Sequence, residues 1–481
     1  MRILMLFMIC IVMAGCSQNN IRTTSQDNNV KFNDTIKELK EVAKQGDAKA
    51  QYYLGMMYLE GKGLPQDDKR ATHWFQKAAK QGDAEAQALL GMMYSVGKGV
   101  LQNDKQAVHW LQKAAKQGDA EAQALLGVMY TEGKGVPQDD KRAVHWFQKA
   151  AEQGVTKAQY YLGLMYVKGK GVPLDYKQAV YWIQKAAKQG DAEAQYNLGL
   201  MYVKGKGVPL DDKQAAHWFQ KAAEQGITKA QYYLGLMYVE GKGVPQDDKQ
   251  AVYWIQKAAK QGDAEAQYNL GLMYVKGKGV PLDNKQAAHW FQKAAEQGVT
   301  KAQYNLGVMY EHGKGVLLDD KQAVHWFQKA AKQGDAKAQY NLGVMYLEGR
   351  GLPQDDKRAT HWFQKAAEQG KAEAQYNLGL MYLKGKDVPQ DDKQAAHWFQ
   401  KAAEQGVTKA QYNLGLMYVK GKGVPLDYKQ AYMWIYLAKY NGFKNTKKPL
   451  EILKKVMTSN NISEAQEKSQ ICLDSGYKDC D

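Results

Sequence analysis

Residues 191–226 read DAEAQYNLGLMYVKGKGVPLDDKQAAHWFQKAAEQG, and this pattern recurs along the chain with a fixed period of 36 residues. All eleven tryptophans of the 481-residue chain occupy a single position of the pattern. They are Trp74, Trp110, Trp146, Trp182, Trp218, Trp254, Trp290, Trp326, Trp362, Trp398 and Trp434. A period this regular predicts one continuous repeat array rather than a set of independent domains.

Each repeat predicts two helices joined by a glycine-containing turn. Residues 191–204 place apolar side chains at helical spacing, and Gly205 suits a left-handed C-cap. Gly207 is expected to keep the turn loose, and Pro209 prevents the first helix from resuming. The acidic residues at 211 and 212 favour the start of a second helix, which ends at Gly226.

The repeat resembles the Sel-one-like repeat family, a relative of the tetratricopeptide repeats. The resemblance rests on residues of the fifth unit that recur in the others. They are Ala194, Leu198, Gly199, Tyr202, Gly205, Gly207, Val208, Asp212, Ala215, Trp218, Ala222, Ala223 and Gly226. It implies an all-α fold, a right-handed α-solenoid of eleven helix–turn–helix units over residues 47–442. One departure is Asp387, which replaces the second turn glycine of the tenth unit.

The first residues, MRILMLFMICIVMAGCSQNN, have the layout of an export signal. One positive charge precedes an apolar run that is too short to span a bilayer. Small residues before Cys16 resemble a bacterial lipobox, although Met13 stands where Leu is usual. We therefore expect a signal peptide at 1–15, lipidation of Cys16 and a flexible tether at 16–33. Ser17 after the cysteine fits outer-membrane sorting in the lipoproteins that it resembles. The alternative is an ordinary signal peptide and a periplasmic or secreted protein.

Caps are predicted at both ends of the array. Residues 34–46 align with a second helix but lack its tryptophan, as a polar capping helix would. Residues 443–481 predict two short helices, the later one beginning at Ser463 with Gln466 as its capping-box partner. In an oxidising compartment, the close pair Cys472 and Cys480 is expected to form a disulfide bond.

The recurring GKG segment does not match a phosphate-binding loop. Five residues rather than four separate Gly163 from Gly169, and no Ser or Thr follows Lys170. The sequence predicts no cofactor. Eight histidines precede the repeated tryptophan, but no two share a helix face at metal-binding spacing. They are His73, His109, His145, His217, His289, His325, His361 and His397. We expect them to be half-buried packing or polar positions, and we expect no metal.

Two Ser-x-x-Lys segments, at Ser95–Lys98 and at Ser475–Lys478, match a motif of penicillin-recognising enzymes. Neither the SDN nor the KTG motif accompanies them. A catalytic site needs a unique convergent constellation of residues, and the near-identical repeats offer none. We therefore predict a non-catalytic protein, with a β-lactam-hydrolysing or penicillin-binding enzyme as the alternative.

Variation among the repeats concentrates on a second stripe of the first helix. In related tetratricopeptide folds the first helices line a concave groove, where Asn and Lys bind peptide backbone and carboxylates. By that resemblance the stripe is the candidate peptide-binding surface. Its residues are Lys157, Tyr161, Lys168, Asn197, Lys204, Asn269, Lys276, Asn305, His312, Asn341, Asn377 and Asn413. The alternative is that they only pack between adjacent first helices.

The net charge of +16 reflects columns of lysine along the array, which could attract acidic proteins, anionic headgroups or polysaccharide. The export signal disfavours nucleic acid, and the only expected membrane contact is the lipid on Cys16. The sequence thus predicts an envelope-anchored scaffold that binds an unknown protein or peptide. A binder of peptidoglycan or surface glycan, and so of a cell-wall polymer, is a further alternative.

Overall fold

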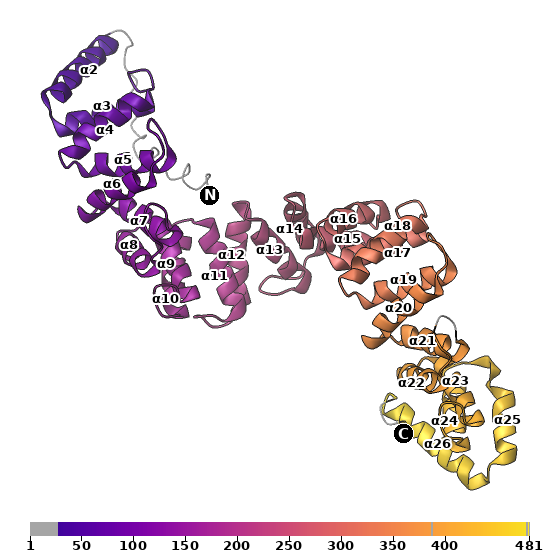
Figure 1. The fold of residues 1–481 in the computed structure, drawn as a ribbon. Helices are drawn as coiled ribbons and strands as arrows, with labels where there is room; N and C mark the ends of the chain where they lie inside the picture. The colour runs from indigo at the N-terminus through magenta and orange to yellow at the C-terminus, as the bar shows by residue number, and fades with distance from the viewer. Residues whose placement is uncertain (1–26, 386–387, 478–479, 481) are drawn as a thin grey trace. The chain divides into compact units, whose positions relative to one another are not determined.

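A computed structural model describes residues 27–385, 388–477 and 480. These residues form 25 α-helices, α2–α26, and one 3-10 helix, and they contain no strand. Helices pack in consecutive pairs, as an all-α solenoid requires (Figure 1). The chain divides into two compact units, Met1–Gln246 and Asp247–Asp481, and the division falls in the turn of the sixth repeat.

Each repeat contributes one first helix and one second helix. The first helices are α3 Ala48–Glu60, α5 Ala84–Val96, α7 Ala120–Glu132, α9 Thr156–Lys168, α11 Ala192–Lys204, α13 Thr228–Glu240, α15 Ala264–Lys276, α17 Thr300–His312, α19 Ala336–Glu348, α21 Ala372–Lys384 and α23 Thr408–Lys420. The second helices are α4 Asp68–Lys80, α6 Asp104–Lys116, α8 Asp140–Glu152, α10 Tyr176–Lys188, α12 Asp212–Glu224, α14 Asp248–Lys260, α16 Asn284–Glu296, α18 Asp320–Lys332, α20 Asp356–Glu368, α22 Asp392–Ala403 and α24 Tyr428–Tyr440.

Capping residues set the ends of both helices, as the fifth repeat shows. The Asp191 carboxylate accepts a hydrogen bond from the backbone N–H of Ala194 at 2.8 Å, and so begins α11. Gly205 ends that helix with φ 61°, the left-handed conformation predicted for it. The carboxylate of Asp211 then caps α12 by accepting from the Gln214 N–H at 2.9 Å.

The core of each repeat lies between its two helices. Leu198 and Phe219 are fully buried in the fifth repeat, and Met201 and Trp218 are 6% exposed. Gly199 permits this packing, because a Cβ atom there would lie 2.7 Å from the ring of Phe219. The glycine inside the first helix is therefore a packing residue, as its place in the repeat predicted.

The second glycine of the turn is tightly packed, and the prediction of a loose turn at Gly207 is wrong. A Cβ atom at Gly207 would overlap the carbonyl oxygen of Tyr176, the first residue of α10 in the preceding repeat. The turn thus lies directly against the backbone of its neighbour. Sequence inspection cannot show this contact, because the partner is a main-chain atom. Asp387, which replaces the equivalent glycine, lies outside the described residues.

Buried glutamine side chains connect successive repeats. The side chain of Gln195 is 4% exposed and donates from Nε2 to the carbonyl oxygen of Ala187 in the preceding repeat, at 3.1 Å. Its Oε1 accepts from Nε2 of Gln225, at the end of the same repeat, at 2.8 Å. Nε2 of Gln225 also donates to the carbonyl oxygen of Gly190 at 3.0 Å. A buried amide needs such partners, so this glutamine ladder fixes each repeat on the one before it.

Helices outside the repeats close both ends, with boundaries that differ from those predicted. At the N-terminal end, α2 spans Asp27–Gln45, so the residues from 27 to 33 of the predicted tether are helical. Asp27, Asn28 and Asn29 suit a helix start, and no Gly or Pro follows before residue 45.

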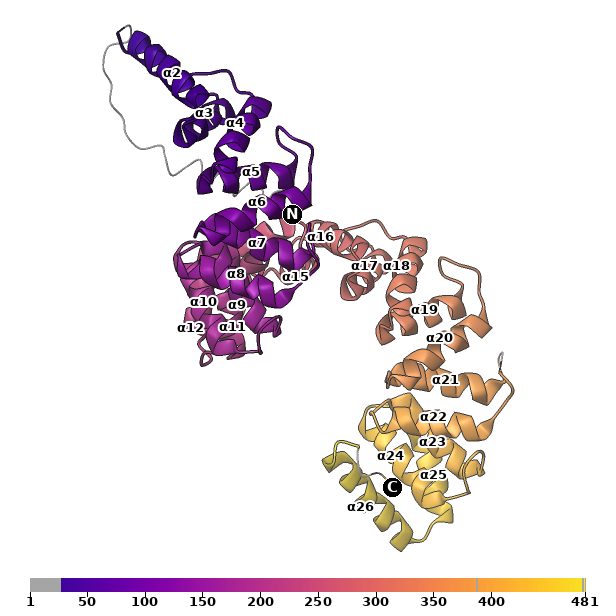
Figure 2. The ribbon, with the colours of Figure 1, turned by 60° about the vertical axis from the view of Figure 1, so that its left-hand side comes forward.

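The C-terminal cap consists of the 3-10 helix Lys444–Thr446, α25 Lys447–Val456 and α26 Ser459–Asp474. Helix α26 lies beside α24 (Figure 2). It begins before the predicted Ser463, because the Thr458 hydroxyl caps it by accepting from the Asn461 N–H at 3.3 Å. Gln466 forms no capping box and instead donates to the Tyr432 hydroxyl at 3.2 Å.

We predict that Gly207→Ala lowers the free energy of unfolding by roughly 2 kcal/mol more than the matched variant Gly226→Ala, because only the first places a methyl group against backbone. Both glycines have positive φ, and no atom lies within 4 Å of a Cβ at Gly226, so the conformational cost is shared. Urea denaturation of the two variants measures the difference. Equal losses of unfolding free energy in the two variants would contradict the close contact between Gly207 and the Tyr176 carbonyl oxygen.

Candidate functional site

The predicted peptide-binding stripe lies on the first helices of the repeats, where two kinds of position alternate. Its six asparagines are half-buried between neighbouring helices. Lys168, Lys204, Lys276 and His312 are exposed at the C-terminal ends of their helices. The Nδ1 atom of His312 lies 2.9 Å from the carbonyl oxygen of Val308, one turn earlier.

The asparagine side chains connect adjacent first helices through their amide N–H groups. In Asn197, Nδ2 donates to the Tyr160 hydroxyl of the preceding repeat at 3.0 Å. The same Nδ2 donates to the Glu193 carbonyl oxygen at 2.9 Å. Both amide protons are thereby used, and Oδ1 is the atom left to accept from a ligand. Hydrogen bonds of the same kind join Tyr268 with Asn305, Tyr340 with Asn377, and Tyr376 with Asn413.

Two further predicted residues are committed to contacts within the fold. The ammonium group of Lys157 lies 2.6 Å from the carboxylate of Asp191, the residue that caps the next first helix. The ring of Tyr161 stacks on Phe147 with centroids 5.4 Å apart. Within each unit the stripe is therefore a mixture of atoms that pack inside the fold and atoms that are accessible. That it binds a ligand stays a prediction.

The tyrosine partners of the asparagines were not predicted, although the sequence contains a signal for them. Every Asn of the stripe follows, 37 residues later, a Tyr in the preceding repeat. Repeats two and three lack this Tyr, and Leu125 and Tyr161 occupy the following stripe positions. Repeats one and five do have this Tyr, as Tyr52 and Tyr196, but Leu89 and Tyr233 follow them, so the paired variation marks the contact only in part.

Accessible apolar side chains complete the face between the asparagines and the exposed helix ends. The position three residues after each Asn carries Leu or Val, which is half-buried. In the second unit these residues are Leu272, Val308, Val344, Leu380 and Leu416. Every repeat from seven to eleven carries Asn at the preceding stripe position, from Asn269 to Asn413. We call this surface of α15, α17, α19, α21 and α23 the first-helix face.

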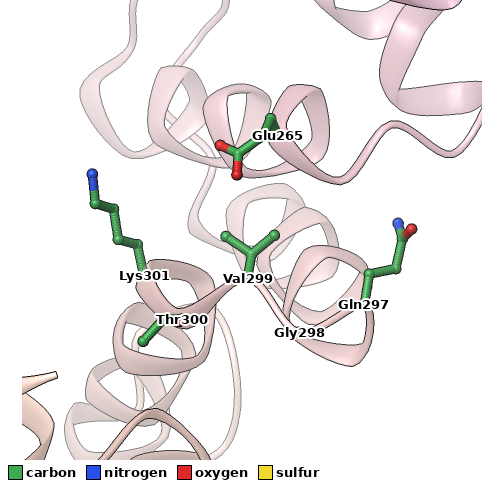
Figure 3. Close-up of a pocket in the computed structure, with 6 residues that line it drawn as sticks. All are labelled: Glu265, Gln297, Gly298, Val299, Thr300 and Lys301. Atoms are coloured by element: carbon green, nitrogen blue, oxygen red, sulfur yellow. The ribbon is translucent and has the colours of Figure 1, made fainter. Parts of the chain in front are cut away.

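Two recesses open at other places in the second unit. The first, of about 380 Å³, lies at the junction of the seventh and eighth repeats. Glu265 and Lys301 flank Val299 there (Figure 3). Val299 precedes α17 without a capping side chain. The second recess, of about 460 Å³, lies beside the C-terminal cap. It is lined by Tyr412, Lys444, Asn445, Lys447, Lys448, Pro449 and Ile452.

Neither predicted Ser-x-x-Lys segment forms a catalytic arrangement in the described residues. Ser95 is 6% exposed, and its hydroxyl donates to the Met92 carbonyl oxygen at 2.7 Å. Lys98, which would be its partner, lies 3.4 Å from the Asp68 carboxylate. The Ser475 hydroxyl donates to the Cys472 carbonyl oxygen at 3.0 Å, and Lys478 lies outside the described residues. Nothing in this geometry supports the enzyme alternative.

The histidine column is exposed, which corrects the expectation of half-buried side chains. Each imidazole lies edge-on to the following tryptophan, with centroids 5.1 Å apart for His145 and Trp146. Tyr181 makes the same contact with Trp182 at 4.9 Å, so the position serves packing on the tryptophan. The described residues contain no group of three His, Cys, Asp or Glu that could hold a metal ion.

The cysteines with predicted roles lie near the two ends of the chain. A disulfide bond joins Cys472 and Cys480 in the structure, beside the core of the last repeats. Cys16 and the predicted signal peptide lie outside the described residues. Among the helices that are described, none has the length and apolar character needed to cross a bilayer.

Comparison with known proteins identifies the repeat. Eleven consecutive segments, from residues 48–83 to residues 408–443, match the Sel1 repeat. The chain belongs to the Sel1 repeat family. The predicted resemblance is confirmed, and each matched segment starts one residue later than the predicted unit. Sel1 repeat proteins are scaffolds that generally mediate protein–protein interactions.

Two solved structures share this architecture. One is a protective antigen of uropathogenic Escherichia coli with an SLR fold, at 41% identity, 91% coverage of this chain, 94% coverage of that chain and a TM-score of 0.82. The other is a Sel1 repeat protein from Oxalobacter formigenes, at 37% identity, 68% and 98% coverage and a TM-score of 0.50. No curated protein sequence matches the chain significantly.

Burial makes the tyrosines between the first helices weaker acids than a free tyrosine. It raises the pKa of Tyr52 to about 12 and also raises the pKa of Tyr160, Tyr268, Tyr340 and Tyr376. Because the pKa is higher in the folded state, folding favours the protonated phenol. This stabilisation is complete below about pH 10, the unfolded value, and is lost as the pH rises through the folded pKa values.

We therefore predict that the free energy of unfolding of this Sel1 repeat protein falls as the pH rises above about 10, the unfolded pKa of tyrosine, towards about 12, the folded pKa of Tyr52. Urea denaturation across that range, with phenolate absorption as a second readout, measures the fall. The variant Tyr268→Phe/Tyr340→Phe/Tyr376→Phe removes three titrating groups and should show a shallower pH dependence. An unchanged slope in this variant would contradict the assignment.

Proposed function

We propose that this Sel1 repeat protein is an envelope-anchored scaffold that captures a protein partner on the first-helix face of residues 264–420. The observation that carries the proposal is the unbroken run of that face over five successive repeats in the second unit. Half-buried Leu or Val supplies apolar area in each repeat, and the Asn Oδ1 atom supplies a hydrogen-bond acceptor.

The face suits an extended or helical segment better than a small molecule. Its acceptors recur once per repeat, and exposed charged residues border them on both sides, such as Glu265 and Lys276 on α15. A polar rim around partly accessible apolar side chains is the usual composition of a protein interface. The proposal is therefore protein binding without catalysis, which agrees with the general role of the family.

Anchoring in the envelope is the second part of the proposal. It is supported by the signal-like layout before Cys16 and by the small residues Ala14 and Gly15. A lipid on Cys16 would hold the repeats near a membrane, and the segment before α2 would separate the two. Periplasmic and surface-facing orientations are both compatible with this layout.

Site-specific photocrosslinking in intact cells tests both parts. A benzophenone side chain at exposed Lys301 or Lys337, on first helices, should crosslink one discrete protein. The same group at exposed Lys285 or Lys321, on second helices, should not. The crosslinked product should sediment with membranes and should move to the soluble fraction in a Cys16→Ser background.

Crosslinking of the same protein from both faces would contradict the assignment of the first-helix face. Membrane sedimentation that is unchanged by Cys16→Ser would instead contradict the anchor, so the two parts fail separately. Thermal unfolding of each purified variant should match the parent, because all four substituted side chains are exposed.

A further inference from the structure

The turns between the two helices fall into two classes in nine of the eleven repeats, whereas repeat two pairs Val96 with Gln102 and repeat ten pairs Lys384 with Gln390. In repeats one, three, six and nine, the first helix ends in Glu and the turn contains Gln. These acidic turns carry the pairs Glu60 and Gln66, Glu132 and Gln138, Glu240 and Gln246, and Glu348 and Gln354. In repeats four, five, seven, eight and eleven, the first helix ends in Lys or His and Leu replaces the Gln. These lysine–leucine turns carry Lys168 and Leu174, Lys204 and Leu210, Lys276 and Leu282, His312 and Leu318, and Lys420 and Leu426.

The two classes differ in how the basic residue between the turn glycines is neutralised. In every acidic turn the glutamate pairs with it, at 2.7 Å for Lys62–Glu60, 2.6 Å for Lys134–Glu132, 2.7 Å for Lys242–Glu240 and 2.8 Å for Arg350–Glu348. In the lysine–leucine turns a second basic residue takes the place of that glutamate. Within the described ranges, Lys168, Lys204 and Lys276 make no ion pair. These turns therefore lack the ion pair between glutamate and lysine or arginine that the acidic turns have.

The leucines of these turns are exposed to solvent. Leu174 is 54% exposed, Leu210 71%, Leu282 63%, Leu318 65% and Leu426 56%. Their place in the turn is fixed by the C-cap glycine, since a Cβ atom on Gly169 would lie 3.4 Å from the Cβ of Leu174. Lys168 and Lys170 flank that glycine and are exposed. In the fourth turn an apolar side chain thus stands beside two exposed lysines, whereas in the fifth turn the ammonium group of Lys206 donates to the Tyr176 hydroxyl at 3.3 Å.

A further substitution lowers the negative charge beside these leucines. All acidic turns have Asp as the first residue of the following helix. Three of the five lysine–leucine turns replace it with an uncharged residue, namely Tyr176, Asn284 and Tyr428. A basic residue replaces Glu and Leu replaces Gln in all five turns, whereas repeats five and eight keep the Asp as Asp212 and Asp320. Four of these turns lie in adjacent repeats, four and five in the first unit and seven and eight in the second.

We propose that the lysine–leucine turns bind the surface of an anionic lipid membrane. Each leucine would enter the boundary between headgroups and acyl chains, and the lysines would contact the lipid phosphates. Charge complementarity favours this occupant over a neutral surface. A membrane accepts single apolar side chains at any lateral spacing. The two recesses of the second unit are lined by other residues, so these leucines do not belong to either recess. The proposal does not rest on lipidation of Cys16.

Cosedimentation of the purified full chain with vesicles tests the proposal. The chain carries Cys16→Ser, so that an acyl group does not contribute to binding. We expect strong binding to vesicles of phosphatidylglycerol and phosphatidylcholine in equal parts, and weak binding to phosphatidylcholine alone. The variant Leu174→Gln/Leu210→Gln/Leu282→Gln/Leu318→Gln introduces the residue that the acidic turns use. It should lower the partition coefficient by roughly tenfold or more.

Matched charge variants separate the turns from the overall charge. Lys168→Glu/Lys204→Glu/Lys276→Glu restores the pattern of the acidic turns and should reduce binding by roughly a hundredfold. Lys213→Glu/Lys249→Glu/Lys285→Glu changes the net charge equally on exposed second-helix positions and should reduce binding much less. Equal losses in the two charge variants would overturn the proposal. Unchanged binding in the leucine variant, or no preference for anionic vesicles, would also overturn it, the latter pointing to an acidic protein as the occupant.

Discussion

The structure depends on a buried amide that every repeat places between itself and its predecessor. Gln195 donates to a helix-end carbonyl of the preceding repeat and accepts from the last glutamine of its own, and in the eleventh repeat Asn441 replaces that glutamine as the donor to Gln411. Because an unpaired amide in this position would be costly, each repeat can be satisfied only in one register with its neighbour. The tight approach of Gly207 to the Tyr176 carbonyl imposes the same register from the turn side.

This constraint explains why the interior is nearly invariant and the surface is not. Core residues such as Leu198, Gly199 and Phe219 recur with small changes, because Gly199 packs on Phe219 within the repeat and Phe219 also stacks on Tyr233 of the next repeat. Exposed positions on the first helices and in the turns are free to differ from one repeat to the next. The differences gather in particular repeats, as in the exposed leucines of the fourth and fifth turns. The surface of this Sel1 repeat protein therefore varies along rows of equivalent residues.

Much of the fold follows from the sequence, because a strict period fixes helix pairs, and capping residues such as Asp211 and Gly205 fix their ends. What the sequence could not show are contacts with main-chain atoms and the choice between competing caps. Gly207 was expected to be loose, and Thr458 rather than Ser463 begins the last helix. The stripe was located correctly on the first helices, but its asparagine amides face tyrosines of the preceding repeat. The direction of an amide cannot be inferred from residue spacing.

Hydrogen exchange of the full chain carrying Gln267→Met tests most directly whether the repeats hold one another. This change removes the bonds to the Ala259 carbonyl oxygen and from Gln297, and it should cost about 1–3 kcal/mol. We predict faster exchange in α15, at the end of α14 in the preceding repeat and at the end of α16. The exposed control Gln286→Met should leave exchange unchanged. Faster exchange confined to α15 would contradict the account.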